Sequence, residues 1–173
     1  MKKIALAACL LVFCSYNSVK AQFLKGIIIN RYDKNAQHHG KWKYLDRSHG
    51  RRLVCFGRFD HGRQVGDWQY YHPNGKLRMT EKYTWEGEKR MVNVSFYHEN
   101  GQVSTQGIAT VEVNGGKTHY YWNGDWIYFE PDGSFWKTVT YNYGQPVKST
   151  YADGRVEVEY NVFPARQVEM PMR

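Results

Sequence analysis

One short unit of sequence recurs four times in this chain, and its spacing limits the folds that the chain can adopt. The central residues of the four copies are Trp42, Trp68, Val94 and Trp126. The first two steps between them are 26 residues long, and the third is 32. Periods of this size are typical of repeat architectures, in which each unit buries its large side chains against its neighbours.

A turn sequence follows each of the four copies of the unit. Three of the turns contain Asn74-Gly75, Asn100-Gly101 and Asp132-Gly133, and a shortened fifth copy ends in Asp153-Gly154. An Asn-Gly or Asp-Gly pair between apolar runs is the strongest short-range signal of a β-hairpin. We therefore expect Gly75, Gly101 and Gly133, together with the repeated tryptophans, to be structural residues of the repeat.

Alternation along the runs assigns side chains to the two faces of a sheet, because successive residues of a strand point in opposite directions. Trp42, Trp68 and Trp126 share one face, where we expect them to form the core. The return strands alternate as well, which predicts a small buried thiol at Cys55 on the face of Leu53. Abundant glycine and tyrosine (16 and 14 residues) disfavour helices. The residues thus predict an all-β fold, an antiparallel meander of hairpins over residues 40–160.

The unit is clearest from Gly66 to Leu77, which reads Gly-Asp-Trp-Gln-Tyr-Tyr-His-Pro-Asn-Gly-Lys-Leu. This pattern resembles the MORN repeat (membrane occupation and recognition nexus), and more closely its variant in secreted bacterial proteins. The resemblance covers about residues 40–160 and implies an elongated single-layer sheet of stacked hairpins. It also implies a scaffold that binds lipids or proteins, and some variant members carry an antitoxin label. The third unit departs from the pattern, since it has Asn93-Val94 in place of Gly-Trp and is followed by an insertion around residues 107–119.

The first 21 residues have the features of an export signal. Lys2 and Lys3 precede an apolar run over residues 4–13, and Val19-Lys20-Ala21 supplies a cleavage site before Gln22. The run is too short to span a bilayer as a stable helix, so we expect no transmembrane segment in the mature chain. The prediction is an exported protein, periplasmic or extracellular, with an uncleaved anchor or lipid attachment at Cys9 as alternatives.

The segments on either side of the repeats are less regular. Residues 22–39 are expected to form a strand at 27–29 and then a polar lead-in, and residues 161–173 a loosely ordered tail.

Charge and cysteine content exclude some partners and bonds. The formal net charge is +8, and the basic residues left after cleavage are interleaved with acidic ones instead of clustered, so we expect no nucleic-acid partner. Cys9 and Cys14 leave with the signal, so Cys55 has no partner for an intramolecular disulfide.

Few residues form a pattern that indicates catalysis or metal binding. Asp67 and Asp125 precede tryptophans in matching units and are the only candidate for a hydrolytic carboxylate pair, although a turn role explains their recurrence more simply. His38-His39 is the only histidine doublet, and neighbours on a strand point to opposite faces, so we expect a solvated pair. We expect no enzyme activity, no cofactor and no metal site.

The second face of the predicted sheet suggests a function. It carries one large side chain in each unit, namely Leu45, Tyr71, Tyr97 and Phe129, and a single layer cannot bury both of its faces without a cover. Exposed aromatic rows mark binding surfaces, unless residues 22–39 cover them. The prediction is a non-enzymatic exported repeat scaffold that binds a protein, glycan or lipid surface, and the alternative is a cell-envelope hydrolase that uses Asp67 and Asp125.

Overall fold

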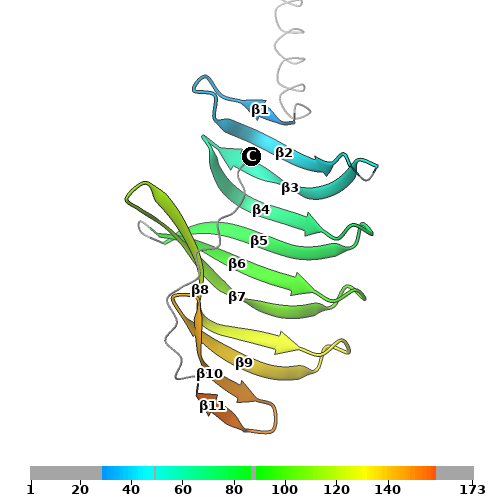
Figure 1. Ribbon diagram of the computed structural model, residues 1–173, viewed down its shortest axis with the longest axis vertical. Helices are drawn as coiled ribbons and strands as arrows, with labels where there is room; N and C mark the ends of the chain where they lie inside the picture. Colours follow the sequence, from blue (N-terminus) through cyan, green and yellow to red (C-terminus); the bar gives the residue numbers. More distant parts are fainter. Residues whose placement is uncertain (1–28, 49, 87–88, 159–173) are drawn as a thin grey trace, which may run out of the picture.

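The computed structural model describes residues 29–48, 50–86 and 89–158, and these residues form one open antiparallel sheet (Figure 1). Eleven strands follow one another in chain order, and each pairs with its neighbours in sequence. The strands are β1 (Arg31–Tyr32), β2 (His38–Asp46), β3 (Arg52–Asp60), β4 (Arg63–Tyr71), β5 (Leu77–Glu86), β6 (Lys89–Tyr97), β7 (Val103–Asn114), β8 (Lys117–Phe129), β9 (Phe135–Asn142), β10 (Gln145–Tyr151) and β11 (Val156–Val158). The predicted all-β meander of stacked hairpins in a single layer is confirmed.

The predicted export signal, Cys9 and the tail at 161–173 lie outside the described residues. Of the strand expected at 27–29, only Ile29 is described, and the first strand of the sheet begins at Arg31 instead. The described residues contain no helix with the length and hydropathy of a membrane span.

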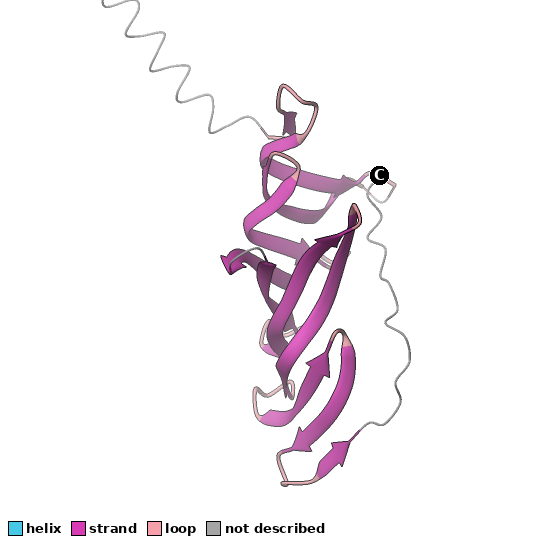
Figure 2. Ribbon diagram, turned by 90° about the vertical axis from the view of Figure 1, so that its left-hand side faces the viewer, coloured by secondary structure: helices cyan, strands magenta, loops and turns pink. Residues whose placement is uncertain are grey.

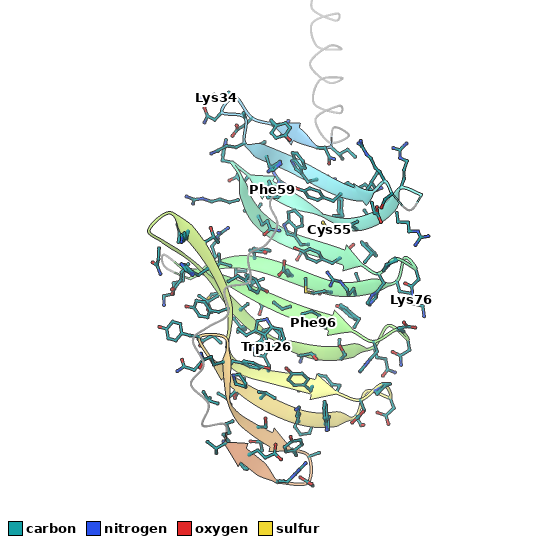
Figure 3. The ribbon with its side chains drawn as sticks, in the orientation of Figure 1. Lys34, Cys55, Phe59, Lys76, Phe96 and Trp126 are labelled. Carbon is teal, nitrogen blue, oxygen red and sulfur yellow. The ribbon has the colours of Figure 1, made fainter. Side chains whose placement is uncertain are left out.

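The turns that follow β2, β4, β6, β8 and β10 are longer than those that follow β3, β5, β7 and β9, and we call them the wide turns. They lie along one edge of the sheet, on the right in Figure 1, and Lys76 marks one of them in Figure 3. In the turn after β4, the amide of Gly75 donates to the carbonyl of His72, and the side chain of Asn74 accepts from the amide of Lys76. Gly75 has a φ of 84°, which side-chain-bearing residues rarely adopt. Gly101 and Gly133 occupy the same place in the next two turns of this edge, so the repeated glycine has a conformational role.

A β-bulge follows each of the first four wide turns. Tyr70 pairs with Met79 but Tyr71 pairs with Leu77, so Arg78 is an extra residue in β5. The bulge moves Leu77 to the face opposite Met79, because directly paired residues share a face. The alternation predicted for the first four return strands is therefore wrong at their first residue. Leu53, for example, does not share the face of Cys55.

The core lies on the face that carries Trp42, Trp68 and Trp126, which we call the tryptophan face. Trp68 and Trp126 are 1% and 0% exposed. The side chains that pack with the three tryptophans come from β3 and from β5 to β7: Cys55, Phe59, Tyr83, Val92, Val94, Ala109 and Val111. Cys55, Phe59, Phe96 and Trp126 mark this face in Figure 3.

Each of the two fully buried indole rings lies on a glycine of the preceding strand. A Cβ atom built on Gly57 would lie 2.1 Å from the ring of Trp68, and one on Gly107 would lie 2.3 Å from the ring of Trp126. The indole Nε1 of Trp126 donates to the carbonyl of Ile108 at 3.2 Å. The ring thus packs directly against the neighbouring backbone, and only glycine leaves room for it.

The insertion after the third unit forms a long hairpin, β7 and β8, that bends over the tryptophan face (Figures 1 and 2). Glu81 on β5 pairs with Val94 on β6, and Val94 pairs with Gly107 on β7. Tyr120 on β8 pairs with Val111, which lies four residues further along β7 than Gly107. In a flat sheet Tyr120 and Glu81 would be about 19 Å apart. The Tyr120 hydroxyl nevertheless donates to the Glu81 carboxylate at 2.9 Å, so the hairpin folds back across the face.

The glycine beneath Trp126 allows a direct test of this packing. Gly107→Ala should lower the free energy of unfolding by about 1 to 3 kcal/mol, because the added methyl group forces the buried ring to move. Gly107 does not have a positive φ, so the loss reports the lack of space and not backbone strain. Urea denaturation measures it.

The matched control is Gln106→Ala, an exposed position next to Gly107, which should stay within about 0.5 kcal/mol of the wild type. Equal stability of Gly107→Ala and the wild type would contradict the close ring-on-backbone contact.

Candidate functional site

The four candidate binding residues form one row on the second face of the sheet, near the edge with the wide turns. Leu45, Tyr71, Tyr97 and Phe129 are all half-buried. We call them the second-face row. The bulges place an apolar partner directly opposite each of them, and these partners are Leu53, Leu77, Val103 and Phe135. The sequence predicted one row of large side chains, and the structure shows a double row.

Hydrogen bonds establish that the row lies on the second face. The Tyr71 hydroxyl donates to Gln69 Oε1 at 2.7 Å, and Gln69 points away from the tryptophan face because it follows Trp68. The Tyr97 hydroxyl lies 3.2 Å from Thr80 Oγ1, and Thr80 is the ladder partner of Gln69. Successive members of the row lie two strands apart, about 10 Å at the usual strand spacing.

The wide turns contact one another and hold this edge together. Asn100 Nδ2 donates to the carbonyl of Pro131 in the next turn, and His98 Nε2 lies 2.9 Å from the carbonyl oxygen of Phe129. Lys76 and Glu99 form an ion pair across two turns at 4.0 Å. These contacts link the turns that follow Tyr71, Tyr97 and Phe129.

A second cluster lies under the long hairpin, around the buried carboxylate of Glu81. Glu81 is 5% exposed. Its Oε2 accepts from the hydroxyls of Tyr70 at 2.6 Å and Tyr83 at 2.9 Å, and its Oε1 accepts from Tyr120. Three hydroxyl donors offset much of the cost of removing a carboxylate from water.

The cluster explains why the third unit lacks its tryptophan. A ring at position 94 would lie over residue 81, just as Trp126 lies over Gly107. Position 81 carries a glutamate instead of a glycine, and the small Val94 leaves space for that carboxylate and for Tyr120. Sequence reasoning missed this cluster because Glu81 belongs to no repeated motif, and its partners come from three strands.

The electrostatics of the cluster keep its hydroxyls protonated. Burial and the negative charge of Glu81 raise the pKa values of Tyr70, Tyr83 and Tyr120 well above that of free tyrosine. Protonated hydroxyls are hydrogen-bond donors at every physiological pH. The arrangement can therefore hold the hairpin on the sheet, and we assign it that role.

The structure does not bring together the carboxylates considered for hydrolysis. Asp67 lies on β4 and Asp125 on β8, with three strands between them, which corresponds to about 19 Å. Glycoside hydrolysis needs carboxyl groups about 5 to 9.5 Å apart. Both side chains are exposed, and Asp125 accepts a hydrogen bond from Thr140 Oγ1 at 2.6 Å.

The prediction of a buried thiol at Cys55 is confirmed. Burial, followed by the charge of Glu81, raises the pKa of Cys55 to about 11. A thiol with so high a pKa forms little of the nucleophilic thiolate at neutral pH.

The histidine doublet is split between the two faces, as predicted. His38 packs against Trp42 and Phe59 on the tryptophan face and is half-buried. The expectation that both histidines are solvated is therefore wrong for His38. His39 points the other way and lies close to Asp60 and His61. The pairing of Gly40 with Phe59 creates this cluster, and no spacing in the sequence indicated it.

Comparisons with known proteins do not assign a function. No protein-family model matches the chain, and no curated protein matches it. Among solved structures, the chain is similar to a protein of unknown function from Bacteroides fragilis, at 12% sequence identity, over 73% of this chain and 93% of that one, with a TM-score of 0.23.

The tyrosines around Glu81 predict a loss of stability in alkali. Unfolded tyrosine ionises near pH 10, whereas these three keep their protons above that pH in the folded state. Their contribution is therefore complete below pH 10 and is lost as the pH rises further. The free energy of unfolding should fall by about 1.4 kcal/mol per pH unit for each tyrosine.

Urea denaturation at a series of alkaline pH values measures this slope. Tyr120→Phe removes one of the three ionising groups and should make the slope shallower by about 1.4 kcal/mol per pH unit. Identical slopes in the variant and the wild type would show that Tyr120 is not buried beside Glu81.

Proposed function

We propose that this protein is a non-enzymatic exported scaffold that binds another protein or an envelope component through its second face. The observation that carries the proposal is the double row of large apolar side chains centred on Leu45, Tyr71, Tyr97 and Phe129. In the described part of the chain, the long hairpin folds over the tryptophan face and leaves the second face as the outer surface.

The double row has the composition of a contact surface. Binding surfaces are rich in tyrosine and other large rings, which supply much contact area at a low cost in side-chain entropy. At one end of the row, Phe135 is 43% exposed beside the half-buried Phe129. Polar side chains flank the row, among them Gln69 and Thr80.

The rigidity of the edge supports the proposal as well. Bonds between neighbouring turns and to the tyrosine hydroxyls hold the row in place before any partner arrives. A surface that is already ordered loses less entropy on binding. The resemblance to MORN-like repeats of secreted bacterial proteins and the predicted export signal are consistent with a scaffold that acts outside the cytoplasm.

The proposal separates two sets of aromatic residues by their effects. Trp68→Ala and Trp126→Ala should each cost about 3 to 5 kcal/mol of stability, because both rings are fully buried. Tyr71→Ala and Tyr97→Ala should cost clearly less stability, because both rings are only half-buried, and should weaken partner binding by about 1 kcal/mol or more each. Melting and binding are measured on the same four variants.

Affinity purification tests the proposal. An envelope extract is passed over the immobilised wild-type chain and, in parallel, over the Tyr71→Ala Tyr97→Ala double variant. A component retained by the wild type and lost from the folded double variant supports the proposal. Equal retention by both would contradict it, as would tyrosine variants that melt as early as the tryptophan variants.

A further inference from the structure

Three side chains with metal-binding atoms converge at the edge opposite the wide turns, close to the first turn of the sheet. They are His39 near the start of β2, Asp60 at the end of β3 and His61 in the turn that follows β3. Their ligand atoms all lie within 4.8 Å of one another. Lys34, in the turn between β1 and β2, marks this region in Figure 3.

His39 carries the first sign of a missing partner. Its Nδ1 atom is buried and makes no hydrogen bond with the described residues. The nearest candidate, Asp60 Oδ1, lies 3.5 Å away, beyond a good hydrogen bond. Buried polar atoms nearly always make a hydrogen bond, so an imidazole nitrogen that faces a carboxylate without one needs an explanation.

His61 is held in the orientation that a metal ligand requires. Its Nδ1 lies 2.5 Å from Asp33 Oδ2, and the Asp33 side chain is itself 7% exposed. This contact leaves Nε2 directed at Asp60 Oδ1, 3.9 Å away. A carboxylate behind a histidine, on the nitrogen that does not bind the ion, is the usual companion of metal-binding histidines.

The backbone fixes the three ligands relative to one another. His61 and Gly62 both have positive φ angles, 44° and 76°, which gives a tight two-residue hairpin turn. The amide of Gly62 donates to the carbonyl of His38 at 2.9 Å, so this turn is tied to β2 directly beside His39. The site therefore needs only small side-chain rotations to close.

We propose that His39 Nδ1, Asp60 Oδ1 and His61 Nε2 bind a divalent transition-metal ion of the zinc type, with Asp33 as the residue that positions His61. Two imidazoles and one carboxylate suit Zn²⁺ and its neighbours better than Mg²⁺ or Ca²⁺, which prefer oxygen ligands. The Asp60 and His61 side chains are 60% and 59% exposed, so water completes the coordination.

The bound ion stabilises the end of the sheet. β1 has two residues, and its turn contacts the turn after β3 through Asp33 and His61. End units of repeat proteins have a neighbour on one side alone and need additional stabilisation. A metal ion that joins β2 to the turn after β3 supplies it.

Calorimetric titration of the untagged, chelator-treated full chain with Zn²⁺ at neutral pH tests the proposal. One ion should bind per chain, and Mg²⁺ should not compete. Asp60→Asn and His61→Gln should each weaken binding by about tenfold or more, and Asp33→Asn should weaken it by about 10- to 100-fold without changing the number of sites. Zn²⁺ should also raise the melting temperature of the wild type but not of the ligand variants.

His72→Gln is the matched control, because His72 lies in a wide turn at the other edge of the sheet, and it should bind Zn²⁺ as the wild type does. The exposed positions of Asp60 and His61 tolerate substitution, and circular dichroism verifies the fold of each variant. No binding by the wild type would overturn the proposal, and so would equal binding by wild type, Asp60→Asn and His61→Gln.

Discussion

An indole ring packed flat against the backbone of the neighbouring strand is the contact on which the rest of this sheet depends. A single layer has no second sheet or helix to cover its large side chains, so these must pack within the layer. Trp68 on Gly57 and Trp126 on Gly107 do so, and an indole N–H bond to the next carbonyl fixes each ring. The tryptophans therefore bury apolar area and join successive hairpins at the same time.

The unit without a tryptophan is the one that the long hairpin folds back over. Glu81 replaces the glycine, Val94 replaces the indole, and the long hairpin of β7 and β8 supplies the missing cover with Tyr120 and Trp122. Trp122 stacks on Trp126 with a centroid distance of 3.7 Å. The hairpin thus covers one face of the sheet only. The double row on the second face, which we propose as the binding surface, stays outside this cover.

The repeat carried most of the fold in its sequence. Regular spacing, turn pairs such as Asn74-Gly75 and alternation around Trp68 predicted a meander of hairpins, because these signals are local. The bulges were not predictable, since Arg78 looks like any alternating residue until its strand is paired. Gly57 and Gly107 did carry a signal, a glycine inside a strand pattern, and its meaning as a place for a ring was missed.

The sites depend on contacts between distant parts of the chain. The sequence predicted the second-face row but neither the Glu81 cluster nor the cluster of His39, Asp60 and His61. The second-face row recurs with the repeat and could be found, whereas its apolar partners depend on the bulges. Glu81 meets Tyr120, 39 residues away, only because the hairpin bends. His39 meets His61 only through the pairing of β2 and β3. Neither contact corresponds to a recognisable residue spacing in the sequence.

A double-mutant cycle on Glu81 and Tyr120 tests most directly whether the long hairpin folds over the tryptophan face. The free energy of unfolding is measured for Glu81→Gln, Tyr120→Phe and the double variant. Direct contact predicts a coupling energy of about 0.5 to 3 kcal/mol, because the second substitution removes a partner that is already lost. Effects that add to within about 0.3 to 0.5 kcal/mol would place the two side chains apart and contradict the account.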